Sequence, residues 1–381
     1  MNQLKLPVKK RAAAPKGRRK PRPADILSSP EALARHIIQF DAEDAATHAP
    51  HTLPSAALMR AMARSPIPWP AGKEPRPAPL HPAPSPEKSL STFDYLVVTW
   101  TTEEAKSLAD ALTPGFPSKT GWYAYAHKFQ TEYVPLIRRG APAVQDSHRL
   151  GSYFPTFITG KRVLCFKSEL HMSQDGPKLP IAKLWQQLIE EVKPRLVITT
   201  GTAGGIGADM QLGDVVVSRQ VRFDCQAKFK NALFHDSSFK SSRLRTPSLE
   251  AAEKLFAANA GHLPPAGRPP RIVAHAEAGV KLPDVVTTDF FAFDDSTDRF
   301  GLQGLGAAVE MGDAVLGMVV QQLGASAPQW TAVRNASDPQ IDSKGLTAKD
   351  AATKAAQIYE KFGYWTTISS AITCWALIMD N

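Results

Sequence analysis

Cysteine is scarce in this sequence, and long apolar runs are missing. Only three of the 381 residues are cysteines, at Cys165, Cys225 and Cys374, and they lie far apart. A disulfide framework or a cysteine-ligated zinc site needs more cysteines, or paired ones, so neither is expected. No run of about 18 apolar residues is present to cross a membrane, and the N-terminus has no apolar segment typical of a secretory signal. We therefore predict a soluble cytoplasmic protein that makes no membrane contact.

The sequence also lacks an excess of either charge outside a short N-terminal stretch. The formal net charge is +9, but residues 1–23 alone carry nine Lys and Arg and no acidic residue. The remainder holds 36 basic and 36 acidic residues and is therefore neutral. Any attraction to a polyanion or to a protein partner is expected from this stretch alone. An organelle transit peptide is an alternative for it, although its prolines disfavour the amphipathic helix that such peptides form.

Residues 1–90 are rich in proline, with 16 of the 32 prolines of the chain. Because proline has no N–H to donate, this segment is expected to be mostly extended or disordered. Ser29-Pro30-Glu31 nevertheless predicts the start of a helix, in which Leu33, Ile37 and Ile38 share one face, and residues 56–63 could form a second one. Two interpretations stay open: a linker with transient helices, or an element that docks on a partner or on the chain's own domain.

From about Phe93 onward, apolar patterns indicate alternating strands and helices. Strands are expected near 95–100, 153–158, 162–166, 196–205, 213–218, 221–225, 271–275, 285–288 and 330–333. Helices are expected near 105–112, 181–192, 248–259 with Ser248 as its cap, 314–323, 347–362 and 364–379. Residues 228–246 read as a polar loop whose lysines, including Lys228, are solvated. This order predicts a three-layer α/β/α domain with a mixed central sheet over residues 91–381, preceded by an extension over residues 1–90.

Residues 196–218, LVITTGTAGGIGADMQLGDVVVS, form the most informative stretch of the chain. A buried strand that runs into glycines lets the backbone turn sharply and approach a ligand closely. Two later segments, VEMGDAV from Val309 and VRNASD from Val333, also fall where a strand ends. Ligands of α/β sheets bind outside the carboxyl ends of the strands, where Glu104, Thr202, Glu310 and Asp338 are all expected.

These motifs, in this order, resemble the nucleoside phosphorylase and nucleosidase superfamily, most closely its methylthioadenosine/S-adenosylhomocysteine nucleosidase branch. The resemblance extends over roughly residues 95–362. It implies a nucleoside phosphorylase-like fold and cleavage of the bond between a purine and a ribose. It also implies a homodimer or a higher homo-oligomer, and no metal or organic cofactor.

The resemblance also implies roles for individual residues. Asp338 matches the acid that protonates N7 of the leaving purine, and Glu104 matches the glutamate that activates water. Arg334 matches an arginine that holds the water and the base in place. Such an acid must stay protonated near neutral pH, so a dry site is expected around Asp338. Without the resemblance, Asp338 could equally form a turn before Pro339, and Glu104 could simply complement a helix dipole. Glu103 would replace Glu104 if the alignment is shifted by one residue.

The candidate substrate-binding residues are Thr202, Ala203, Gly204, Phe291, Glu310, Met311, Asp313 and Ser337. Thr202 is expected beside the attacking water, and Phe291 either stacks on the purine or belongs to the core. One position departs from the family: Gly312 stands where relatives carry the glutamate that grips the ribose hydroxyls. Asp313 or Glu310 could take over this contact, or sugar recognition could be weakened.

The absence of an arginine separates two reactions. Phosphorylases of the superfamily bind phosphate with an arginine two residues before the glycine turn, where this chain has Thr199, and an uncharged residue cannot neutralise a phosphate dianion. We therefore expect hydrolysis of an adenine-type nucleoside or nucleotide. The alternatives are a phosphate-dependent phosphorylase and a nucleoside-sensing or signalling module, including one in stress or defence, with little turnover. A third function, nucleic-acid binding through residues 1–23, could coexist with catalysis.

Overall fold

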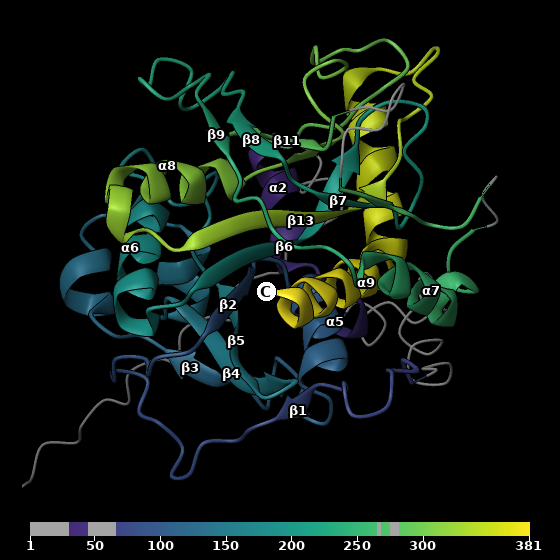
Figure 1. The fold of residues 1–381 in the computed structure, drawn as a ribbon. Coiled ribbons are helices and arrows are strands. Elements are labelled where there is room, and N and C mark those ends of the chain that lie inside the picture. The colour runs from purple at the N-terminus through teal and green to yellow at the C-terminus, as the bar shows by residue number, and fades with distance from the viewer. Residues whose placement is uncertain (1–29, 45–65, 265–267, 275–281) are drawn as a thin grey trace, which may run out of the picture.

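The computed structural model describes residues 30–44, 66–264, 268–274 and 282–381 (Figure 1). The basic stretch 1–23 and the expected helix at 56–63 lie outside the described residues.

A 13-stranded mixed sheet runs through the molecule, as the sequence predicts. Its main order is β1-β4-β5-β2-β6-β12-β11-β8-β9, with β13 beside β6 and β7, β10 beside β7, and β3 beside β4. The parallel strands β5, β2, β6 and β13 lie side by side, whereas β4 is antiparallel to β5 and β12 to β6. The strands are β1 (Arg76–Pro77), β2 (Tyr95–Thr99), β3 (Tyr123–Tyr125), β4 (Gly151–Ile158), β5 (Lys161–Ser168), β6 (Leu196–Gly205), β7 (Val215–Val217), β8 (Gln220–Phe223), β9 (Ser238–Lys240), β10 (Ile272–Val273), β11 (Asp284–Thr287), β12 (Ala308–Glu310) and β13 (Gln329–Asp338).

Helices cover both faces of this sheet, which gives the three layers (Figure 1). Successive side chains of a strand point to opposite faces, so Leu96 and Val98 of β2 pack with α6 and α8, whereas Tyr95 and Val97 pack with α5, α7 and α9. Strand β2 is fully buried because both of its faces are covered. The helices are α2 (Pro30–Gln39), α5 (Thr102–Leu112), α6 (Pro180–Val192), α7 (Leu249–Ala260), α8 (Asp313–Leu323) and α9 (Ala348–Asp380), with short turns η1 (Phe129–Tyr133), η2 (Ala143–Ser147) and η3 (Gly324–Ser326).

The C-terminal part of the chain forms one helix, so the prediction of two separate helices is wrong. Helix α9 is 33 residues long and continues through Gly363, although Figure 1 shows that it bends sharply along its length. The Tyr359 ring lies where a side chain at position 363 would project, and the hydroxyls of Thr366 and Thr367 donate to the Gly363 carbonyl. Hydroxyl groups that bond to the backbone in this way are a known cause of helix bending.

Ser248 precedes α7 as expected, but its side chain does not cap that helix. The Ser248 hydroxyl instead donates to Asp380 at the end of α9, at 2.6 Å. This contact ties the start of α7 to the C-terminal end of α9.

Residues before Phe93 contribute to the folded unit, although the sequence analysis expected ordered structure to begin there. Strand β1 pairs with β4, and the Trp69 ring packs on Trp375 of α9 with centroids 4.8 Å apart. Helix α2 begins where predicted, and Leu33, Ile37 and the following Phe40 pack on α9 in a cluster that includes Tyr359. Of the two interpretations left open, docking on the chain's own domain therefore holds for α2.

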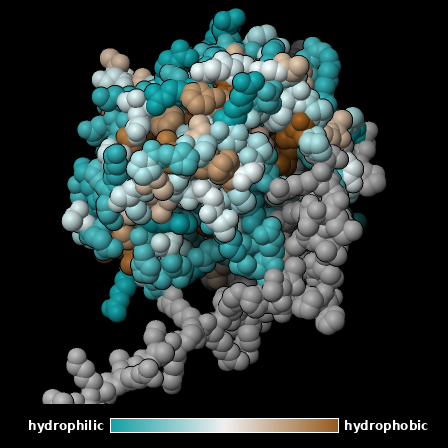
Figure 2. Space-filling view, turned by 90° about the horizontal axis from the view of Figure 1, so that it is seen from below, coloured by the Kyte–Doolittle hydropathy of each residue, from teal (hydrophilic) through white to brown (hydrophobic). Residues whose placement is uncertain are grey.

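The face shown in Figure 2 is mostly hydrophilic, and its apolar side chains lie in small separate groups. Large exposed apolar side chains among the described residues are Phe157, Leu233 and Leu282. Within the described ranges, every helix is too short or too polar to cross a membrane.

Candidate active site

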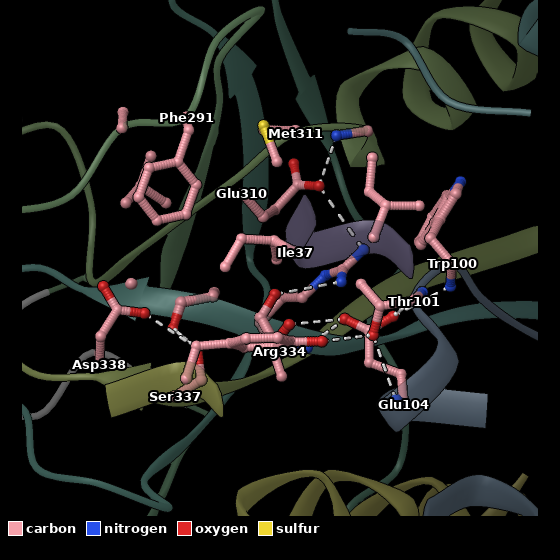
Figure 3. Close-up of a pocket in the computed structure, with 18 of the residues that line it drawn as sticks. Ile37, Trp100, Thr101, Glu104, Phe291, Glu310, Met311, Arg334, Ser337 and Asp338 are labelled. Carbon is pink, nitrogen blue, oxygen red and sulfur yellow. Dashed lines mark hydrogen bonds and ion pairs between the residues drawn. The ribbon is translucent and has the colours of Figure 1, made fainter. Parts of the chain in front are cut away.

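A pocket opens where β2, β6, β12 and β13 end, at the edge of the sheet that the sequence analysis identified (Figure 3). Its lining includes every predicted site residue except Asp313. In Figure 3, Asp338 and Ser337 lie at one end, Trp100, Thr101 and Glu104 at the other, and Arg334 between them. The residues of the lining that were predicted are Glu104, Thr202, Ala203, Gly204, Phe291, Glu310, Met311, Arg334, Ser337 and Asp338.

Glu104 is buried in the first turn of α5 and accepts five hydrogen bonds. One carboxylate oxygen accepts from the backbone N–H and the hydroxyl of Thr202, both at 2.7 Å. The other accepts from the Thr99 hydroxyl at 2.7 Å and from the N–H groups of Trp100 and Thr101 at 3.0 and 2.9 Å. Burial alone would raise the pKa of Glu104, but the Arg334 charge and these hydrogen bonds outweigh it and lower the pKa. Glu104 is therefore an ionised base.

Glycine at position 201 makes this arrangement possible. Gly201 has a φ of +141°, and a Cβ at this position would overlap the Glu104 carboxyl group. The glycine turn thus lets β6 approach Glu104 directly, which is the close backbone approach that the sequence predicted.

Asp338 lies at the end of β13 and is also buried, but it accepts fewer hydrogen bonds than Glu104. The register of β13 against β6 shifts between Ala336 and Asp338, and this bulge brings Ser337 and Asp338 together on the pocket wall. The Ser337 hydroxyl donates to Asp338 at 2.9 Å. Burial raises the pKa of Asp338 to about 7, despite the opposing effect of this hydrogen bond. Asp338 therefore stays largely protonated below neutral pH.

Arg334 lies between these two groups and is held by Asp313. The two residues form a bidentate pair, with distances of 2.7 Å from Nε and 2.5 Å from Nη2 to the carboxylate oxygens. Burial alone would lower the pKa of Arg334, but the surrounding carboxylates, led by Asp313, raise it, so the guanidinium stays charged. Asp313 does not line the pocket, because both of its oxygens are bonded to Arg334 behind the wall. Of the two residues considered for the sugar contact, Asp313 thus lies outside the pocket lining and Glu310 lies within it.

Glu310 is the carboxylate of the VEMGDAV motif that faces the pocket. It accepts from the backbone N–H of Gly312 at 2.5 Å and of Asp313 at 3.0 Å, and from the Thr287 hydroxyl. Burial and the Asp313 charge raise the pKa of Glu310, against the lowering effect of Arg334. Glu310 thus caps the N-terminus of α8 and also presents its carboxyl group to a ligand.

Trp100 fills the space beside Gly312. A Cβ at Gly312 would lie 3.4 Å from the Trp100 ring, which also stacks on the Arg334 guanidinium with 4.9 Å between the two groups. A Cβ at position 312 would therefore be in van der Waals contact with this ring. The Trp100 side chain thus forms an aromatic wall of the pocket beside the position where relatives carry a glutamate.

The structure also shows where Glu103, Phe291 and Thr199 lie. Glu103 accepts from the Ala42 N–H at 3.0 Å and lies beside Lys106, so it faces α2 and not the pocket. Phe291 lines the pocket and at the same time packs with the apolar side chains of α9. Thr199 is buried inside β6 and is not part of the lining.

Several pocket residues were missed from the sequence: Ile37, Ile38, Trp100, Thr101, His171, Ala292, Val309 and Tyr359. Trp100 and Thr101 directly follow β2, so their proximity to Glu104 could have indicated them. The positions of Ile37 and Tyr359 depend on how α2 and α9 pack, which no local pattern encodes. Within the described residues, no group of three His, Cys, Asp or Glu side chains could hold a metal ion.

Comparison with known proteins gives the family. The sequence profile of the Phosphorylase superfamily matches residues 94–362. The chain belongs to this superfamily. The match begins just before β2 and includes the ends of all four strands that form the pocket.

Curated relatives within the superfamily match over short stretches. A 5′-methylthioadenosine/S-adenosylhomocysteine nucleosidase of Chromohalobacter salexigens is 56% identical over 36 residues, which is 9% of this chain and 15% of the relative. The enzyme of the same name from Listeria innocua is 29% identical over 93 residues, 24% of this chain and 37% of the relative. The matched stretches thus span well under half of the length of these relatives.

Solved structures also align with most of this chain. Futalosine hydrolase of Helicobacter pylori aligns at 15% identity and a TM-score of 0.44, over 75% of this chain and 97% of that one. A 5′-methylthioadenosine/S-adenosylhomocysteine nucleosidase from Neisseria meningitidis, in complex with methylthio-immucillin-A, aligns at 18% identity and a TM-score of 0.44, over 76% and 99% of the two chains.

Proposed function

We propose that this protein is a nucleosidase that hydrolyses the N-glycosidic bond of an adenine-type nucleoside or nucleotide. The observation that carries the proposal is the pair of opposite pKa shifts in one pocket, with Asp338 raised to about 7 and Glu104 lowered. Two carboxyl groups whose surroundings push their pKa values apart are suited to act as an acid and a base at the same pH.

In the proposed reaction, a water molecule beside Glu104 and Thr202 attacks the anomeric carbon of the ribose. Glu104 takes a proton from this water, the bond from C1′ to the purine nitrogen breaks, and Asp338 gives its proton to N7 of the leaving base. The products are a free sugar and a neutral base. The positive charge of Arg334 keeps Glu104 ionised, and Phe291 lies on the pocket wall where it could stack on the base.

Electrostatics favours water over phosphate as the nucleophile. The ionised Glu104 lines the pocket, and the nearby guanidinium of Arg334 is already paired with Asp313. A phosphate dianion next to the Glu104 carboxylate would be repelled, and Thr199 offers no charge to compensate.

A product assay tests the proposal against both alternatives. We expect adenosine to yield adenine and free ribose at a rate independent of phosphate, measured by chromatography of the base and the sugar. Ribose 1-phosphate formed only with phosphate would show a phosphorylase instead. Tight binding without either product would favour a sensing module. The feature of the sequence that supports this alternative is Gly312, which stands where relatives carry a glutamate.

The role of Glu104 can be tested without changing Glu104 itself. We expect Gly201→Ala to lower kcat about 10²-fold, because the added methyl group overlaps the Glu104 carboxyl group and a misplacement of about 1 Å can cost this much. The matched control is Gly261→Ala, since a Cβ there would meet no atom within 4 Å. Steady-state kinetics of both variants, with thermal unfolding to verify folding, gives the comparison. Unchanged turnover in Gly201→Ala would remove Glu104 from the proposed mechanism.

A further inference from the structure

His171 offers a free hydrogen-bond donor on the pocket wall. It is 6% exposed and lines the pocket. Its Nδ1 lies 3.2 Å from the backbone N–H of Ser173 and 2.9 Å from the Ser173 hydroxyl. Because a backbone N–H can only donate, Nδ1 is the acceptor and the neutral ring carries its proton on Nε2. Burial lowers the pKa of His171 to about 4, so this tautomer persists at neutral pH. Among the described residues, Nε2 has no hydrogen-bond partner.

Two cations are fixed next to His171. Lys228 donates to the Ser173 carbonyl at 2.6 Å, and Arg138 donates twice to the Gln174 carbonyl, at 3.2 and 3.0 Å. Lys228 is therefore held in place. The prediction that this lysine is simply solvated is wrong. Its charge lies close enough to act on the pKa of His171.

A carboxylate of α2 forms ion pairs with both cations. One oxygen of Glu31 lies 2.6 Å from Arg138 Nη2 and 3.4 Å from Lys228 Nζ. The backbone carbonyl of Glu31 also accepts from the Gln174 side chain at 3.4 Å. The first turn of α2 thus places an anion between Arg138 and Lys228, which hold the carbonyls of two residues shortly after His171. His171 belongs to the pocket lining, and the two cations lie just outside that lining.

The other end of α2 covers the pocket. Entry of a ligand is therefore linked to the loss of the ion pairs that Glu31 makes with Arg138 and Lys228. Ile37 and Ile38 line the pocket, and Asp41 pairs with Lys106 of α5. The cavity has a volume of about 60 Å³, whereas small-molecule sites usually have roughly 300 Å³ or more. A nucleoside therefore needs more room than this cavity has. A displacement of α2 would provide that room, and it would also withdraw Glu31 from Arg138 and Lys228.

We propose that His171, Lys228 and Arg138 form a phosphate subsite, and that the substrate is a nucleoside 5′-phosphate whose phosphate takes the place of the Glu31 carboxylate. This inference rests on the proposed nucleosidase function, because it names the substrate class of the same pocket. Lys and Arg are suited to a phosphate as charged donors, and His171 adds a neutral donor on the side of the ribose.

The test compares AMP with adenosine in the full chain. We expect kcat/KM to be at least tenfold higher for AMP than for adenosine. Lys228→Met should lower this AMP-to-adenosine ratio about tenfold, because a charged hydrogen bond to the phosphate is lost. Glu31→Gln is expected to raise kcat/KM for AMP, because it removes the competing carboxylate. The control is Lys254→Met, since Lys254 is exposed on α7 and pairs with Glu250, and this variant should leave the ratio unchanged.

The outcomes separate this inference from the proposed function. Hydrolysis of both substrates with a ratio near one, or a ratio insensitive to Lys228→Met, overturns the phosphate subsite and leaves the nucleosidase intact. If neither substrate gives a free sugar product, the proposed nucleosidase function fails. Calorimetry then tests the subsite, because the affinity for AMP should exceed that for adenosine and the difference should depend on Lys228. Inorganic phosphate added to AMP distinguishes the source of the group: inhibition at low millimolar concentration, together with a ratio near one, would show a site for free phosphate.

Discussion

Asp338→Asn is expected to lower kcat/KM by 10²-fold or more at pH 6 to 7, because asparagine cannot donate a proton to the leaving base. Of the two carboxyl groups at the ends of the pocket, Asp338 alone is expected to carry a proton in this pH range. The wild-type kcat/KM should fall about tenfold per pH unit above about pH 7, as Asp338 ionises in the free enzyme. This decline should be missing in the variant. The measurement is a pH profile of adenosine or AMP hydrolysis for both proteins.

Stability provides the control for Asp338→Asn. The pKa of Asp338 is higher in the folded chain, at about 7, than the value of about 4 expected for an unfolded one. The folded state therefore binds the extra proton between these values, and its contribution to stability is lost as the pH rises through this window. Asparagine has no such dependence and can still accept from the Ser337 hydroxyl. Its melting temperature relative to wild type should thus increase from pH 4 to pH 7. Full activity in a folded Asp338→Asn variant would exclude Asp338 as the acid.

Glu104→Gln is expected to have the second large effect, a loss of 10² or more in kcat with the base removed. Five donors point at the two carboxylate oxygens of Glu104, so the amide nitrogen of glutamine would face a donor on either side. This conflict should cost about 1–3 kcal/mol of stability, measured by denaturant unfolding, because a buried polar group loses its partner.

Thr202→Val separates the chemical role of Glu104 from its structural one. The variant removes one hydroxyl donor and keeps the Glu104 carboxylate, so the pKa of Glu104 should rise. The acidic limb of the kcat/KM profile should then move to higher pH, with the plateau reduced far less than in Glu104→Gln. An acidic limb at the wild-type position would argue that Glu104 is not the group that titrates there.

Local patterns in the sequence were sufficient for most of the fold. The continuous apolar run of β2 and the helical spacing in α6 follow from which faces are buried, and these elements lie where the sequence predicts them. The continuity of α9 could not be predicted in this way. Gly363 usually weakens a helix, but here it is packed against Tyr359, and this packing is a tertiary contact that overrides propensity.

The site residues that lie at or near the ends of strands could be predicted from the sequence. Glu104 follows β2, Thr202 lies near the end of β6, and Glu310 and Asp338 are the last residues of β12 and β13. All four line the pocket, as expected for residues at the ends of strands. The contribution of α2 to the pocket was not predictable. The apolar face of this helix indicates that it packs on an apolar surface, but it does not indicate which surface. The same holds for Asp313, whose pairing with Arg334 depends on how α8 is oriented against β13.

The continuity of α9 has a further consequence for the way this chain folds as a unit. The superfamily match ends at residue 362, in the middle of this helix. The half beyond that point contains Ile368, Trp375 and Leu377, which are among the most deeply buried side chains that cover the sheet. The limits of sequence similarity therefore do not coincide with the limits of the cooperative structure, and a fragment cut at the edge of the match would leave one face of the sheet without its cover.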